Sequence, residues 1–200
     1  MVLSPLLPVN AIQIITTRSP LFYSLAAVRL IYKGQSMFWD PSGSYGDDIE
    51  RPDYYEENPV PENFYRSQDL ITQGDPDLPL YWRYSIFTGD NGMEVFEWTL
   101  TEKQAQYYYK LLLKGARQRD NKEGFITKES VKICSAAVSS FLQRFGGDII
   151  PLQEHFILPH GLAHALHELH PNRIYYFEVD RPITIMGNAQ LSKQNHLHGN

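Results

Sequence analysis

The sequence predicts one α+β domain built around a mostly antiparallel sheet. Segments rich in β-branched and large apolar residues fill the first half of the chain, apolar residues recur at helical spacing in the middle, and strand-like segments return near the end. Strands and helices grouped in this way are typical of α+β folds. Because 200 residues suffice for one buried core, we expect a single domain over residues 1–191 and a flexible tail over residues 192–200.

The first predicted element is a strand over residues 11–16. A second strand, over residues 24–32, is separated by Lys33-Gly34 from a third over residues 35–40, and a short turn containing glycine is typical of a hairpin. A segment rich in Pro, Gly and Asp follows. We expect a long loop over residues 41–79, which either borders a substrate cleft or is structural filler.

A second hairpin and a helix are predicted next. Residues 80–88 and 93–100 flank a Gly-Asp-Asn-Gly turn, which favours pairing of the two segments. Thr101 and Gln104 then form a capping box, so a helix should begin there and end near residues 117–121.

The following predicted helix carries the only cysteine of the chain. We expect Ser130 to cap this helix and Gly146-Gly147 to end it. Its inward face is predicted to comprise Cys134, Ala137, Val138, Phe141 and Leu142. Cys134 therefore falls in an early turn and faces the core.

The last predicted helix begins at Pro159 and is stopped by Pro171. Two closing strands, over residues 173–179 and 183–186, should complete the sheet. The apolar stripe of this helix is predicted to comprise Leu162, Ala165, Leu166 and Leu169.

Composition excludes several classes of function. A net charge of -5 argues against nucleic acid as a partner, because phosphate binding normally needs a cluster of Lys and Arg. A single cysteine excludes internal disulfides and zinc sites built on several thiolates. The N-terminus lacks the basic opening of a signal peptide, and no stretch reaches the roughly 20 apolar residues that span a bilayer.

Cys134 is the residue with the clearest chemical potential. A thiol near a helix N-terminus gains from the helix dipole and from unpaired backbone N–H groups, which lower its pKa and can also hold an oxyanion. These are the requirements of acyl transfer, provided that a base is within reach. A buried, inert core cysteine is the alternative, since Cys134 shares its stripe with apolar residues.

The order of several segments resembles that of a known family. VFEWTLTEKQAQYYYKLLLKGARQ followed by KICSAAVSSFLQRF is similar to the central block of circularly permuted papain-like hydrolases of the NlpC/P60 type, which include toxins delivered by type VI secretion. Upstream, SLAAVRLIYKGQSMFWDPSGSYG resembles their early hairpin, and downstream ILPHGLAHAL resembles their closing helix. The resemblance covers roughly residues 20–170, and it rests on the order of the pieces more than on any single motif.

The resemblance implies a catalytic set with one departure. Cys134 would be the nucleophile, but the position of the family's catalytic histidine is occupied by Leu25, which cannot accept a proton. Either this alignment is off, another histidine serves, or the site is inactive. His155 is the candidate base, with a loop residue of no role as its alternative. Asp40 is the candidate for orienting the base, although Asp before Pro is also a common turn opener.

By the same resemblance, the substrate would be an amide bond, expected in a peptidoglycan peptide, and no cofactor or metal is implied. Another acyl substrate is the alternative, because members of the family also act on lipids or other acyl groups. The protein would be an antibacterial effector, made in the bacterial cytoplasm without a signal peptide, secreted, and active in the periplasm of a target cell. An immunity protein and a component of a secretion apparatus are the partners that this implies.

Two other functions stay open at this stage. One is a non-catalytic binding domain of the same fold, for which Leu25 is the clue. The other is a metal-binding protein, because His160, His164 and His167 recur at a spacing that can bring imidazoles to one helical face. A solvated polar face explains the same histidines without any metal.

Overall fold

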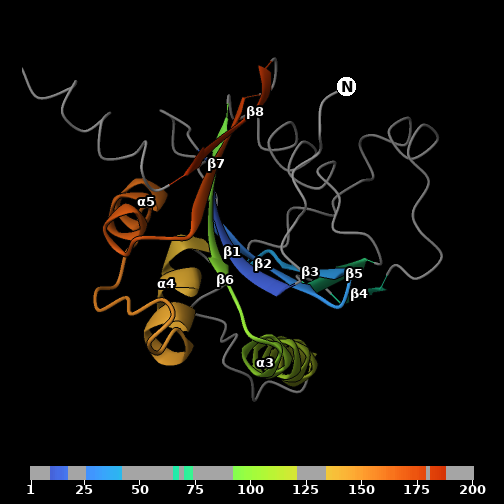
Figure 1. Ribbon diagram of the computed structural model, residues 1–200. Coiled ribbons are helices and arrows are strands. Elements are labelled where there is room, and N and C mark those ends of the chain that lie inside the picture. Colours follow the sequence, from blue (N-terminus) through green and yellow to red (C-terminus); the bar gives the residue numbers. More distant parts are fainter. Residues whose placement is uncertain are drawn as a thin grey trace, which may run out of the picture.

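The fold is organised around an eight-stranded antiparallel sheet, with the strands in the order β4-β5-β3-β2-β1-β6-β7-β8 (Figure 1). The computed structural model describes residues 10–17, 26–41, 65–67, 70–73, 92–120, 134–178 and 181–187. The strands are β1 (Asn10–Thr17), β2 (Ala26–Tyr32), β3 (Gln35–Trp39), β4 (Tyr65–Ser67), β5 (Leu70–Gln73), β6 (Met93–Thr99), β7 (Arg173–Glu178) and β8 (Arg181–Gly187). The predicted α+β class and antiparallel sheet are confirmed.

Strand β1 occupies the centre of the sheet. Ile14 stands opposite Val28 of β2 on one side and opposite Phe96 of β6 on the other. The β2–β3 hairpin turns at Lys33 and Gly34, whose φ angles of 51° and 69° are both in the left-handed region. Such a turn matches the twist of the flanking strands. The predicted hairpin is therefore confirmed, with β1 joined to it as a third strand.

Two short strands, β4 and β5, lie inside the range that was expected to be a loop over residues 41–79. Strand β5 pairs with β3, and Ile71 stands opposite Phe38. The apolar and β-branched run from Leu70 to Thr72 suits a strand between two neighbours, here β3 and β4, but its polar flanks concealed it in the sequence. The strand predicted over residues 80–88 lies outside the described residues, whereas the strand predicted to follow it is present as β6.

The described helices are α3 (Glu102–Asp120), α4 (Cys134–Phe145) and α5 (Pro159–Glu168). The capping box is present at the start of α3, where the Thr101 backbone N–H donates to Gln104 Oε1 at 2.8 Å and the Gln104 N–H donates to Thr101 Oγ1 at 3.3 Å. Helix α5 begins at Pro159 as predicted. Ser130, the expected cap of the cysteine helix, lies outside the described residues.

All three described helices pack against the same face of the sheet. Figure 1 shows α4 and α5 beside the sheet and α3 below it. Alternate strand residues such as Ile14, Val28 and Trp39 join buried helix residues in one apolar core. The buried residues of α5 are Pro159, Leu162, Ala163 and Leu166. Ala165 and the C-cap residue Leu169 are only partly buried, so the buried stripe is rotated slightly from the predicted one.

The opposite face of the sheet is buried as well, and it contains a polar row. Arg29 of β2 stands opposite Gln13 of β1, Gln13 stands opposite Glu97 of β6, and Glu97 stands opposite Arg173 of β7. Gln13, Arg29 and Glu97 are each at most 1% exposed. Nothing in the apolar pattern of the sequence distinguished this row from an ordinary solvated strand face.

Candidate functional site

Cys134 is the first residue of α4 and lies against the start of β2. Its Sγ accepts a hydrogen bond from the Ala26 backbone N–H at 3.2 Å, across a sequence separation of 108 residues. The side chain is only 6% exposed. The inward orientation predicted for Cys134 is therefore present, with the sulfur placed between α4 and the central strand β2.

Backbone N–H groups converge on the sulfur. The N–H groups of Ala26, Ser135 and Cys134 itself each favour the thiolate and lower the pKa of Cys134. Donors of this kind are what an oxyanion hole requires. The N-terminus of the cysteine helix and the start of β2 thus direct backbone N–H groups at the sulfur.

Asp40 is the second predicted residue that the fold brings to this site. It follows β3 directly and is fully buried. Its negative charge lies close enough to raise the pKa of the Cys134 thiol. Asp40 and Cys134 are therefore neighbours in space, although 94 positions apart in the sequence.

The thiol is protonated at neutral pH in this arrangement. Burial is the largest effect, and together with the charge of Asp40 it outweighs the N–H groups and raises the pKa of Cys134 to about 11. The sequence predicted a lowered pKa from the helix N-terminus. That prediction was wrong for this conformation, because burial destabilises the thiolate more than the backbone N–H groups at the helix N-terminus stabilise it.

His155 lies in the loop between α4 and α5 and contacts the middle of α4. Its Nδ1 lies 3.3 Å from Ser139 Oγ and 3.3 Å from Ser140 Oγ. Ser139 is five residues beyond Cys134, or roughly 7.5 Å along the helix axis. The structure thus brings Cys134 and Asp40 together but places His155 one and a half turns away. Leu25 lies outside the described residues.

Two buried serines of α4 were missed by the sequence reasoning. Ser135 donates to the Ile157 carbonyl, and Ser139 accepts from the Phe156 N–H at 3.1 Å. These bonds fasten the loop that carries His155 to the cysteine helix. The sequence contained a signal for this role. Ser135 and Ser139 are four residues apart beside the apolar face of the helix, a spacing that predicts buried hydroxyls that need hydrogen-bond partners.

The histidines of α5 do not form a metal site. His160 and His164 are exposed, whereas His167 lies half-buried with its Nε2 3.4 Å from Glu94 Oε1 and its ring edge-on to Phe96. Within the described residues, no group of three or more His, Cys, Asp or Glu side chains is placed to hold a metal ion. The three histidines are therefore a mixed set, two in solvent and one in contact with a carboxylate.

A second buried carboxylate, Glu97, lies at the centre of the polar row. Gln13 Nε2 donates to it at 2.6 Å, and the Tyr175 hydroxyl donates to both of its oxygens at 3.1 Å. Burial raises the pKa of Glu97, although these hydrogen bonds oppose the shift. The group is separated from the thiol by the sheet, since it lies on the face opposite the helices.

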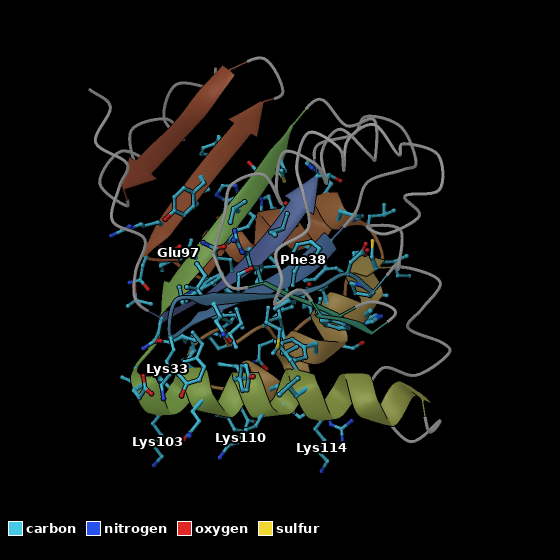
Figure 2. The ribbon with its side chains drawn as sticks, turned by 90° about the vertical axis from the view of Figure 1, so that its right-hand side faces the viewer. Lys33, Phe38, Glu97, Lys103, Lys110 and Lys114 are labelled. Atoms are coloured by element: carbon cyan, nitrogen blue, oxygen red, sulfur yellow. The ribbon has the colours of Figure 1, made fainter. Side chains whose placement is uncertain are left out.

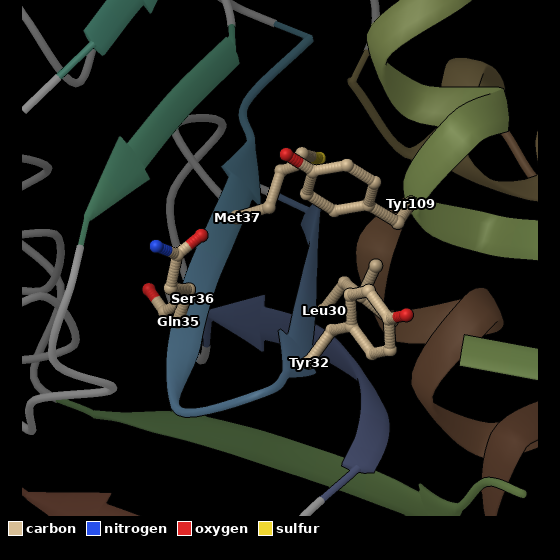
Figure 3. Close-up of a pocket in the computed structure, with 6 residues that line it drawn as sticks. All are labelled: Leu30, Tyr32, Gln35, Ser36, Met37 and Tyr109. Atoms are coloured by element: carbon tan, nitrogen blue, oxygen red, sulfur yellow. The ribbon is translucent and has the colours of Figure 1, made fainter. Parts of the chain in front are cut away.

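A small pocket lies between α3 and the β2–β3 hairpin. Its walls are formed by Leu30, Tyr32, Met37 and Tyr109, with Gln35 and Ser36 at the strand side (Figure 3). It has room for about one water molecule, which is too little for a peptide group. It is therefore not a substrate site in this conformation.

Comparison with known proteins leaves the resemblance as a prediction. No family model matches the chain, and neither a curated protein nor a solved structure matches it. Among the described helices, none combines the length and the apolar character needed to cross a membrane.

Proposed function

We propose that this chain is a papain-like cysteine hydrolase of the NlpC/P60 type, in which Cys134 cleaves an amide bond of peptidoglycan. The observation that carries the proposal is the Ala26 N–H that donates to Cys134 Sγ at 3.2 Å, to which the N–H groups of Cys134 and Ser135 at the helix N-terminus add. Asp40 beside the thiol supports it further. The proposed role as a secreted antibacterial effector, with an immunity protein as partner, rests on the resemblance alone.

The proposed chemistry proceeds in two steps. The thiol proton passes to a base, and the Cys134 thiolate attacks the carbonyl carbon to form a tetrahedral oxyanion that the N–H groups stabilise. The C–N bond then breaks, the amine leaves with a proton, and water hydrolyses the thioester to restore the thiol. His155 is the proposed base, and this role requires its ring to leave Ser139 and Ser140.

A non-catalytic binding domain of the same fold is the second candidate. It is favoured by the raised pKa of Cys134 and by the position of His155, which hydrogen bonds Ser139 and Ser140. Under this proposal the site binds its ligand without breaking it.

Hydrolysis of purified peptidoglycan fragments separates the two candidates. A hydrolase loses activity in Cys134→Ala, and His155→Ala slows it by about 100-fold or more because a general base is removed. His164→Ala is the matched control, since that histidine is exposed and makes no hydrogen bond within the described structure.

The alternative outcomes are equally specific. Binding of the fragments that persists in Cys134→Ala, with no cleavage by the unaltered protein, supports the binding domain. Cleavage that survives Cys134→Ala contradicts the proposed nucleophile. Circular dichroism of each variant confirms that the fold is retained.

A further inference from the structure

The exposed side of α3 carries a basic stripe that the thiol site does not use. Lys103, Lys110 and Lys114 are exposed there, and Tyr107 stands among them with 51% of its surface accessible. The spacings of four, three and four residues place the four side chains on one side of the helix. Figure 2 shows the three lysines directed away from the sheet. We call these four residues the lysine stripe.

Among the side chains of α3 that the structure describes, no acidic residue neutralises the stripe. Glu102, in the first turn, is already engaged, because its carboxylate accepts from the Tyr32 hydroxyl at 3.0 Å and lies 3.3 Å from Lys33 Nζ. No Asp or Glu stands three or four positions from a stripe lysine. Lys110 and Lys114 are themselves four apart, a spacing at which like charges repel.

The local charge is opposite to that of the whole chain. The sequence of α3 contains five basic and two acidic residues, in a chain whose net charge is -5. The three exposed lysines of the stripe thus form a positive surface on a chain of net negative charge. A charged surface of this kind steers a partner of opposite charge into one orientation.

We propose that the lysine stripe is a docking surface for an acidic segment of a partner protein. Tyr107 is the aromatic anchor at the centre, and the lysines form the charged rim, an arrangement that matches the anatomy of protein interfaces. The stripe runs over twelve residues, from Lys103 to Lys114, and its ends are roughly 16 Å apart along the helix axis, which suits one helix or strand of a partner.

The same observations disfavour membranes and nucleic acids. The apolar side of α3, with Ala105, Tyr108 and Leu112, is buried in the core and is not free to enter a bilayer. Three lysines on a chain of net charge -5 are too few to bind a nucleic acid, because such binding depends on many contacts between basic side chains and phosphates. An acidic protein segment needs only a local match of charge and an anchor contact.

Fluorescence anisotropy with a defined probe tests the proposal. The probe is a short labelled peptide of Glu and Asp with one central Phe, and a second probe has Gly in place of that Phe. We expect Lys103→Gln/Lys110→Gln/Lys114→Gln to weaken binding of the first probe by about tenfold or more. Tyr107→Ala should weaken binding of the Phe probe and leave the Gly probe unchanged, because only the Phe contacts the anchor.

Matched controls and competing ligands complete the experiment. Lys110→Glu should reduce binding, whereas Arg144→Glu should not, although both change the net charge equally and both residues are exposed. Equal binding of the Phe probe by the unaltered protein and by the triple lysine variant overturns the proposal that the lysine stripe is a docking surface. Tighter, stripe-dependent binding to single-stranded DNA or to phosphatidylserine vesicles overturns the assignment to a protein partner.

Discussion

Cys134 shows how opposing effects on a single atom decide its chemistry. Three backbone N–H groups stabilise a thiolate at this position, yet burial and the nearby Asp40 carboxylate together have the larger effect on the pKa. A hydrogen bond to sulfur does not offset the loss of hydration when nearly the whole side chain is covered. For catalysis, the site must therefore open to solvent or substrate, or Asp40 must lose its charge.

The first prediction concerns the reactivity of this thiol. Alkylation of the folded protein by iodoacetamide should be slow at neutral pH and should rise about tenfold per pH unit toward pH 11, because only the thiolate reacts. The unfolded protein in urea should follow a thiol pKa of about 8.5. Asp40→Asn should shift the folded profile to lower pH, since a neighbouring negative charge is removed. A plateau below pH 8 in the unaltered folded protein would contradict the buried, protonated thiol.

Glu97 carries the second prediction at this scale. The pKa of Glu97 is raised in the folded state, so the folded protein binds this proton more tightly than the unfolded protein does. Protonated Glu97 therefore contributes to the free energy of unfolding below pH 4.5, the ordinary pKa, and this contribution is lost as the pH rises through the folded-state pKa. In urea titrations, the free energy of unfolding of Glu97→Gln should rise relative to that of the unaltered protein between pH 3 and pH 7, because only the unaltered protein loses this contribution. The exposed residue Glu154 provides the control, Glu154→Gln. A difference that does not change with pH contradicts the role assigned to burial.

The C-terminal end of α4 is set by the stereochemistry of two neighbouring glycines, Gly146 and Gly147. Helix α4 ends where the Gly146 N–H donates to the Leu142 carbonyl at 2.7 Å, and a β-carbon at Gly146 would collide with the carbonyl oxygens of Leu142 and Ile150. The next residue, Gly147, has a φ of +55° and open space around its missing side chain. Two adjacent glycines are thus required for different reasons, the first by close approach and the second by backbone conformation.

Alanine substitutions distinguish these two reasons. Gly147→Ala should cost about 1 kcal/mol, the ordinary cost of a left-handed residue with a side chain. Gly146→Ala should cost about 3 kcal/mol or more, because the backbone must shift to relieve overlap with two carbonyl groups. Urea unfolding followed by circular dichroism measures both. Equal losses in the free energy of unfolding for the two variants would show that the backbone after α4 relaxes more easily than the close contacts at Gly146 imply.

At the scale of the whole molecule, the sheet assembles residues that the sequence keeps far apart. The start of β2, the end of β3 and the start of α4 meet at the thiol, and four strands contribute to the polar row on the opposite face. Both groups depend on strand order and register, which no local pattern encodes. The lysine stripe is different, since helical spacing alone brings its members together.

The amino-acid sequence by itself determined the α+β class, the β2–β3 turn, the capped start of α3, the glycine stop of α4 and the proline start of α5. Each of these depends on neighbours within a few residues, so propensity, periodicity and turn chemistry suffice. Only the tertiary structure decided that Asp40 reaches Cys134, that His155 bonds Ser139 and Ser140, and that the thiol is too buried to ionise at neutral pH. Burial and long-range contact arise from packing of distant segments, and desolvation acts only once that packing exists.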